Sequence, residues 1–235
     1  MTNEGINVHE HMLELALGAL AHANWHANYH SFENSRWSEL SVLQAAHACE
    51  ILIKARIAQE HPLLIFEHLP KPQPGQASLS IRELVEGGRT YQYSDLPDRL
   101  WATTGIRLPG LERHKEFGRL RNTIQHFLAP SYMDISYETI AFIYEVIDPF
   151  INTSWGLFAV DYNEDHEEYI YLVGGLIRRG VRFLASPGMM ECFDSIDFEW
   201  PQGDSEYRKF MESRFEVARA AYPPRAPSRR SSRSE

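Results

Sequence analysis

The feature that most constrains the fold of this chain is a helical segment with a proline on each side. Residues 111–128, LERHKEFGRLRNTIQHFL, follow Pro109-Gly110 and precede Ala129-Pro130. A proline cannot continue helical hydrogen bonding and disfavours helix at the residue before it, so both prolines are expected to bound the helix. Apolar side chains recur within it at helical spacing, at Phe117, Leu120, Ile124, Phe127 and Leu128. We therefore predict one amphipathic helix that packs this stripe against a core.

The opposite face of the predicted helix is polar and mostly cationic. It carries Lys115, Arg119, Asn122 and His126. Arg121 lies at the edge of the apolar stripe, five residues before His126. Only its long, flexible side chain could therefore bring a guanidinium toward the imidazole. Arg121, Asn122 and His126 become the candidate catalytic residues.

Further helices are expected on both sides of this segment, which makes the protein mainly α. Helical periodicity predicts them over residues 7–30, from 35 or 38 to about 60, after Ser80, from about 95 to 104, and from 136 onward. The expected N-terminal caps are Ser35 or Ser38, Ser80 with Glu83 as a capping box, Ser94 with Asp95, and Ser136. Pro149 is expected to kink or end the helix that Ser136 opens.

The C-terminal third is expected to add helices and short strands. Asn163 is a candidate cap for a helix with acidic residues in its first turn, Arg178-Arg179 in its last turn and Gly180 just beyond it. The Gly174-Gly175 pair leaves a hairpin as the alternative. Short strands are expected over residues 181–184 and 196–200, a final helix over about 205–221, and a disordered basic tail over 223–235.

Composition favours a soluble, cytoplasmic protein with no membrane contact. The longest apolar stretch, residues 169–177, is too short to span a bilayer, the N-terminus lacks the features of a secretory signal, and the two cysteines fit a reducing compartment. The formal net charge is −9, so binding to a nucleic acid requires a local basic patch. Residues 107–126 offer one, with Arg107, Arg113, Lys115, Arg119 and Arg121 against Glu112 and Glu116.

Two segments resemble the HEPN domains, helical bundles whose nuclease members carry an Arg-x(4–6)-His motif, often with Asn directly after the Arg. Here the motif is Arg121-Asn122-Thr123-Ile124-Gln125-His126. Residues 45–55, AAHACEILIKA, are similar to the second helix of these domains, with Glu50 four positions before Lys54. The resemblance covers roughly residues 5–156. It implies an HEPN-like helical bundle, a host-defence or toxin-like ribonuclease, and a homodimer in which two motifs meet.

These residue types suit RNA cleavage without a metal or another cofactor. Histidine titrates near neutrality, which fits His126 as general acid or base, and the planar fork of Arg121 can stabilise charge on the phosphorane. Asn122 can orient the imidazole or hold the phosphate. Lys115 and Arg119 are candidate RNA-binding residues. Glu50 either forms a solvated salt bridge with Lys54 or faces Arg121 and fixes its rotamer.

Other interpretations of the same residues stay open. The main rival is a noncatalytic HEPN-like scaffold that binds nucleotides or proteins. Arg121 could also form only a buried ion pair with Glu50. A third interpretation is a zinc hydrolase built on His22, His26 and His30, whose spacing places neighbouring imidazoles one helical turn apart. No motif supplies further zinc ligands.

Regulation by a partner is the last expectation drawn from the resemblance. Some toxins of the family continue the motif as His-x-Tyr, where the tyrosine is the target of an antitoxin. Here Leu128 occupies that position, although Tyr132 is near. An antitoxin or regulatory protein therefore remains a possible partner. The expected organisation is an HEPN-like domain over 1–156, an extension of unknown role over 157–222, and the tail.

Overall fold

The computed structural model describes residues 7–29, 31–71, 78–164 and 169–222. The fold is mainly helical, as expected, and its helices in chain order are α1 (Val8–Asn28), α2 (Trp37–Glu60), α3 (Ile81–Gly87), α4 (Leu96–Thr104), α5 (Leu111–His126), α6 (Ile135–Phe142), α7 (Asp148–Trp155), α8 (Ile170–Arg178) and α9 (Ser205–Ala221). Strands β1 (Phe66–His68) and β2 (Arg89–Thr90) form a short antiparallel pair. No described helix is long and apolar enough to cross a membrane.

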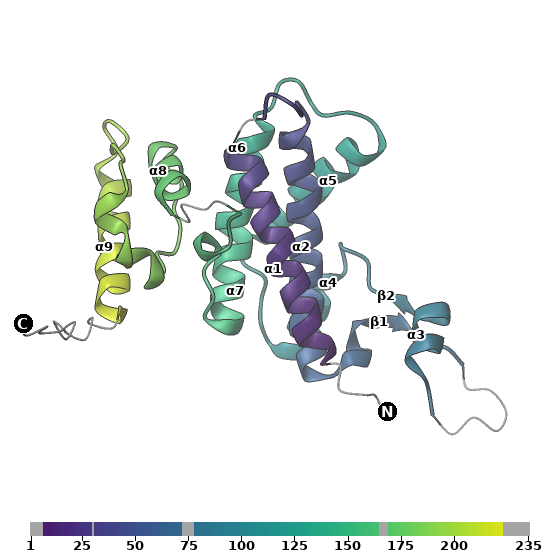
Figure 1. Cartoon of the computed structure of the whole chain (residues 1–235). Coiled ribbons are helices and arrows are strands. Elements are labelled where there is room, and N and C mark those ends of the chain that lie inside the picture. Colours follow the sequence, from purple (N-terminus) through teal and green to yellow (C-terminus); the bar gives the residue numbers. More distant parts are fainter. Residues whose placement is uncertain (1–6, 30, 72–77, 165–168, 223–235) are drawn as a thin grey trace, which may run out of the picture.

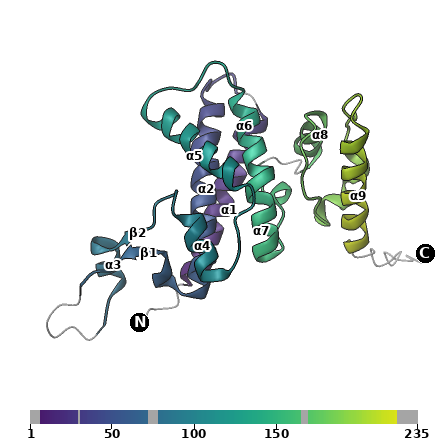
Figure 2. The same cartoon turned by 180° about the vertical axis from the view of Figure 1, so that it is seen from behind.

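The long helices α1 and α2 pack along their length and form the centre of the bundle (Figure 1). Small side chains permit this close approach, because Ala16 and Ala23 of α1 and Ala45 and Ala48 of α2 are all buried. On the other side of this pair, α5 packs on α2 and α6 (Figure 2). The face of α2 that carries Glu50 therefore lies next to α5.

The caps of these helices differ in part from the expected ones. Ser80 and Glu83 form the predicted capping box of α3. Neither Ser35 nor Ser38 caps α2, whose N-cap is Arg36 without a side-chain bond. Asp134, and not Ser136, caps α6, because its carboxylate accepts the N–H of Tyr137 at 3.0 Å. The prediction missed Asp134 because any of several polar residues near a helix start can supply the accepting oxygen.

Pro149 does not end its helix, so that alternative was wrong, whereas the alternative of a kink stays a prediction. Residues Ile143–Ile147 are a π-helical segment that joins α6 directly to α7, and Pro149 lies in the first turn of α7. The wider π turn accommodates a residue that lacks an N–H. Gly110 lies against this segment in the left-handed conformation, and a Cβ there would come 2.9 Å from the side chain of Val146.

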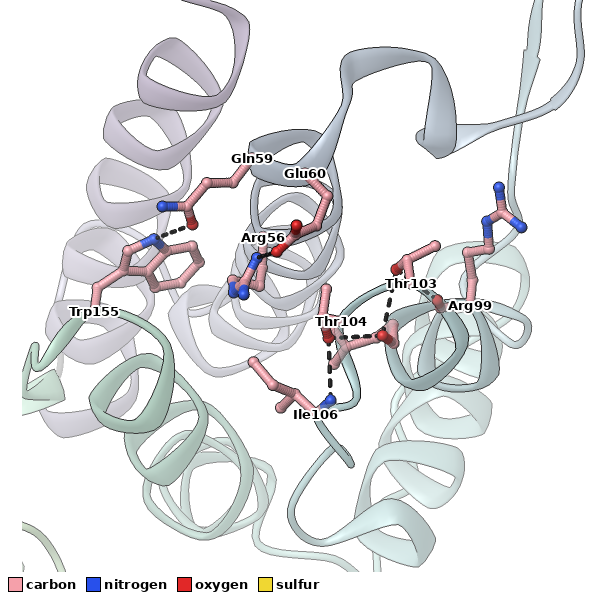
Figure 3. A network of polar contacts seen from close by, with 9 residues as sticks. Arg56, Gln59, Glu60, Arg99, Thr103, Thr104, Ile106 and Trp155 are labelled. Carbon is pink, nitrogen blue, oxygen red and sulfur yellow. Dashed lines mark hydrogen bonds and ion pairs between the residues drawn. The ribbon is translucent and has the colours of Figure 1, made fainter.

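Polar contacts hold the connections that lead into α5 and out of α7 (Figure 3). Gly105 ends α4 in the left-handed conformation, and the hydroxyl of Thr104 accepts the N–H of Ile106 at 3.1 Å. In the same view, the indole N–H of Trp155 donates to the side chain of Gln59, near the C-terminal end of α2, at 3.2 Å. The C-terminal end of α2 and the entry to α5 are thus each held by a side-chain hydrogen bond.

The C-terminal residues pack beside the bundle and are joined to it by buried polar groups. Asp148 is fully buried and accepts the backbone N–H groups of Ala159 and Leu184, each at 2.8 Å. Burial raises the pKa of Asp148 to about 7, although these two donors act in the opposite direction. The contacts cross the domain boundary expected at residue 156, and α8 and α9 lie together on one side of α7 in both views.

The helical interpretation is confirmed around Gly174-Gly175, which lies inside α8, and Gly180 follows the helix in the left-handed conformation. The start expected at Asn163 was wrong, because residues 163 and 164 are not helical and α8 begins after Tyr169. The hairpin alternative was wrong. The strands expected at 181–184 and 196–200 are absent from the described chain; these residues run as irregular segments whose buried side chains include Phe183 and Ile196. The tail over 223–235 and residues 165–168, which include three of the expected first-turn acidic residues, lie outside the described residues.

Candidate functional site

The helix α5 ends two residues earlier than the sequence predicts. His126 is its last residue, and the backbone carbonyl of Thr123 accepts the N–H groups of both Phe127 and Leu128. These two apolar residues therefore leave the core-facing stripe, and their exposed fractions are 82% and 51%. Their expected burial was wrong because the chain turns away from the helix before Pro130, where a helical conformation is disfavoured.

A cleft of about 420 Å³ follows the polar face of α5. One wall is the loop after β2, and the other is α5 itself. Its lining residues are Gln92, Tyr93, Ser94, His114, Lys115, Gly118, Arg119, Arg121 and Asn122. The cleft thus brings together the predicted residues Lys115, Arg119, Arg121 and Asn122, but His126 is not in its lining.

Arg121 is held in the cleft by three neighbours. Its guanidinium donates to the side-chain oxygen of Asn122 at 2.9 Å, lies 3.7 Å from a carboxylate oxygen of Glu50, and is placed 5.8 Å from the ring centre of Tyr93. Glu50 makes both expected contacts, because its other oxygen accepts from Lys54 at 2.6 Å, but the pair with Lys54 is largely buried and not solvated. Both ion pairs are at least partly buried, and the contact with Glu50 restricts the rotamer of Arg121. Because Glu50 is shared with Lys54, it does not neutralise the charge of Arg121 on its own.

His126 lies one helical turn beyond Asn122, exposed at the end of α5. No described residue forms a hydrogen bond or ion pair with its imidazole. The guanidinium of Arg121 turns toward Glu50 and Tyr93 and does not contact His126. Within one chain, the structure therefore gathers Arg121 and Asn122 and leaves His126 accessible just outside the cleft.

The basic patch has fewer unpaired cations than the number of Arg and Lys residues in 107–126 suggests. Arg113 is paired with Glu138 at 2.7 Å and with Glu145 at 3.0 Å, and Lys115 is paired with Glu112 at 2.7 Å. Sequence separation hid the partners of Arg113, which lie on α6 and on the π segment. Among the described residues, no carboxylate lies within ion-pair distance of Arg119. Arg119 is therefore the cation of the cleft with the least local compensation.

Sequence reasoning missed the other lining residues of the cleft, and among them His114 is the most unusual. His114 is only 1% exposed and stacks flat on Tyr93, with ring centres 4.1 Å apart and an interplanar angle of 4°. Neither ring nitrogen has a hydrogen-bond partner among the described residues. Burial lowers the pKa of His114 to about 4, with a smaller contribution from the charge of Lys115, so the ring is neutral near pH 7. Its position three residues before Phe117, on the buried face, was the available signal.

Gly118 explains how the Tyr93 ring lies so close to α5. A Cβ at this position would come 2.7 Å from a ring carbon of Tyr93, so only glycine leaves room for the ring against the helix backbone. A glycine inside a helix costs about 1 kcal/mol relative to alanine. The close packing of Tyr93 accounts for its presence here.

The histidines of α1 do not form a metal site in the described chain. His22 is paired with Glu164 at 2.8 Å, and His26 contacts the side-chain oxygen of Gln44 at 2.7 Å. His30 lies outside the described residues. Among the residues that the structure describes, no group of three His, Cys, Asp or Glu side chains is placed to hold a metal ion.

Comparisons with protein-family models, with characterised proteins and with solved structures find no match.

Proposed function

We propose that this protein is a metal-independent endoribonuclease of the HEPN type, with its RNA lying along α5. One observation carries the proposal: Arg121 and Asn122 meet in a cationic cleft whose C-terminal end leads to an exposed histidine, His126. The resemblance of this Arg-Asn-x-x-x-His segment to the nuclease motif supports the same assignment. A noncatalytic scaffold would need neither an accessible imidazole nor a positioned guanidinium.

The proposed reaction is an internal transfer at phosphorus. The 2′-oxygen attacks the adjacent phosphorus while a base removes its proton, and the bond from phosphorus to the 5′-oxygen breaks as an acid protonates that oxygen. The products are a 2′,3′-cyclic phosphate and a 5′-hydroxyl, so no metal, water or oxidant is consumed. His126 supplies proton transfer, Arg121 stabilises the negative charge on the phosphorane, and Asn122 positions Arg121 or the phosphate.

A homodimer would supply the second proton-transfer group, because one motif offers a single imidazole for two proton transfers. The residues after His126 support such an assembly. Phe127, Leu128 and Tyr132 have exposed fractions of 82%, 51% and 87%, so three large hydrophobic side chains lie on the surface shortly after His126. We name these three residues the apolar patch. Packing of two patches across a two-fold axis would bring both His126 side chains toward one cleft.

The biological role proposed from the same resemblance is host defence or toxin-like growth arrest in the cytoplasm through RNA cleavage. An antitoxin or another regulatory protein would then restrain the enzyme. The exposed Tyr132 is the candidate contact residue for such a partner, because Leu128 replaces the tyrosine that the family's His-x-Tyr toxins carry.

The proposal is tested by RNA cleavage in the presence of EDTA. We expect His126→Ala and Arg121→Ala each to lower the rate by about 10²-fold or more. Both should fold, since His126 is exposed and Glu50 keeps its partner Lys54 when Arg121 is removed. His47→Ala, which changes an exposed histidine of α2, is the matched control and should retain full activity. Equal cleavage by all four proteins would contradict the assignment, and RNA binding without cleavage would favour the scaffold.

A further inference from the structure

The burial of His114 presents an energetic problem that core packing does not solve. A buried donor or acceptor without a partner costs about 1–3 kcal/mol. The ring stacks on Tyr93 at a centre distance of 4.1 Å and has Phe142 as a more distant, tilted neighbour at 6.5 Å, and a phenylalanine could stack here without that cost. A polar ring at this position is therefore unfavourable in the protein alone, which points to a ligand that completes its hydrogen bonds.

The ring of Tyr93 covers His114 and is held there mainly by stacking. The Tyr93 hydroxyl reaches the backbone carbonyl of His114 at 3.4 Å, near the upper limit for a hydrogen bond. Gln92 and Ser94, on either side of Tyr93, are exposed and line the same cleft. Tyr93 covers the face of the His114 ring, so a shift of the Tyr93 ring would uncover His114 toward the cleft without breaking a strong polar contact.

The lining of the cleft divides into a neutral part and a cationic part. Neutral His114 offers one ring donor and one ring acceptor, and the amide of Gln92 offers both kinds of group. Tyr93 supplies an aromatic face, on which any base can stack. Arg119 supplies a positive charge at the same cleft. An unpaired nucleobase with its attached phosphate matches this combination of groups.

We infer that the cleft between Tyr93 and α5 binds one unpaired RNA base, that His114 hydrogen-bonds to the edge of that base when the Tyr93 ring shifts, and that Arg119 contacts its phosphate. The identification of the ligand as RNA rests on the proposed function. His114 determines specificity and takes no part in the chemistry, because three helical turns, about 18 Å, separate it from His126.

The test measures binding and does not depend on cleavage. The four nucleoside 5′-monophosphates and ribose 5-phosphate are titrated separately into the full-length protein labelled with ¹⁵N at histidine. We expect one base to bind at least tenfold more tightly than ribose 5-phosphate and to shift the ring nitrogen signals of His114. His114→Phe should reduce that preference about tenfold and also raise the midpoint of thermal unfolding, whereas His47→Phe should change neither.

A second variant tests whether the position of the Tyr93 ring controls access to His114. Gly118→Ala places a methyl group where the Tyr93 ring now lies, so it should displace the ring and change nucleotide affinity at least threefold while α5 remains helical. Unchanged affinity in Gly118→Ala, together with unchanged preference in His114→Phe, would overturn the inference.

Other outcomes separate this inference from the proposed function. Equal binding of all five ligands would show a phosphate site only and would overturn the base pocket. RNA cleavage without mononucleotide binding would overturn the pocket and leave the ribonuclease proposal standing. Selective binding without any RNA cleavage would keep the pocket and remove the nuclease, and a lack of both would reject both proposals.

Discussion

At the scale of single residues, Lys54 and His114 show two ways in which a polar side chain is buried in this bundle. Lys54 is 9% exposed, but it donates to Glu50 and to the hydroxyl of Thr90. His114 is 1% exposed and has no such partner among the described residues. The first arrangement satisfies its charge within the fold, whereas the second leaves a cost that should be measurable.

The cost of burying His114 leads to a prediction about stability. His114→Phe should raise the free energy of unfolding near neutral pH by about 1–3 kcal/mol, because it removes two unsatisfied nitrogens and keeps the stacked ring. Urea denaturation of the variant and of the wild type measures the difference. A loss of stability in the variant would contradict the account of this site.

The same residue predicts the sign of a pH effect. The pKa of His114 is about 4 in the folded protein and 6.5 for an ordinary histidine, so the unfolded chain binds the proton first as the pH falls. The wild type should therefore lose stability between pH 6.5 and 4, by on the order of 3 kcal/mol. His114→Phe lacks this loss, so the gap between the two proteins should widen on acidification. A constant gap across this range would show that His114 titrates normally.

At the scale of elements, helices with clear local signals were predictable from the sequence. The capping box of α3 and both ends of α9 agree with the prediction, because side-chain caps and periodicity act within a few residues. The strands expected at 181–184 and 196–200 failed for the opposite reason. A short apolar run needs a partner strand to become a sheet, and here such runs bury their side chains against helices instead.

The candidate site also contains features that local sequence signals predicted and features that they did not. Helical periodicity correctly grouped Lys115, Arg119 and Asn122 on one face, and Glu50 does face Arg121. The pairing of Arg113 with α6 and the stacking of Tyr93 on His114 depend on which elements become neighbours, and a single sequence contains no direct signal for that. Phe127 and Leu128 were misassigned because periodicity alone does not show where a helix ends.

The charge of α5 leads to a prediction about RNA affinity. Arg119→Gln should weaken binding of single-stranded RNA and reduce the slope of log affinity against log salt by about 0.7, the contribution of one phosphate contact. Lys115→Gln should have a smaller effect, because Lys115 is paired with Glu112. Arg82→Gln, on exposed α3 and paired with Glu86, is the control. If all three variants bind with one salt slope, the RNA does not lie along α5.

At the scale of the whole molecule, buried contacts join the C-terminal residues to the bundle, while the apolar patch after α5 stays exposed. Asp148 contacts Ala159 and Leu184 in the interior, so the extension packs as part of the same core. The apolar patch lies at the end of α5 instead, next to His126. Assembly through this patch would leave the extension free for other contacts.

The apolar patch leads to a prediction about assembly. Sedimentation should show a dimer of the 27.2 kDa chain, and Phe127→Asp should shift it to monomer and lower RNA cleavage at least tenfold, because a charge would be buried at the interface. Val217→Asp adds the same charge at another exposed apolar residue, on α9, and should change neither property. A wild-type monomer that cleaves RNA at full rate would contradict the shared site.

The most direct measurement of the central proposal uses the 2′-hydroxyl of the substrate. An RNA whose cleavage site has been mapped is synthesised again with a single 2′-deoxyribose on the 5′ side of that bond and incubated with the protein in EDTA. The proposed mechanism predicts that cleavage at this bond disappears, while the all-ribose RNA gives a 2′,3′-cyclic phosphate and a 5′-hydroxyl. Continued cleavage of the substituted bond, or no cleavage of any RNA, would contradict the proposed role of α5.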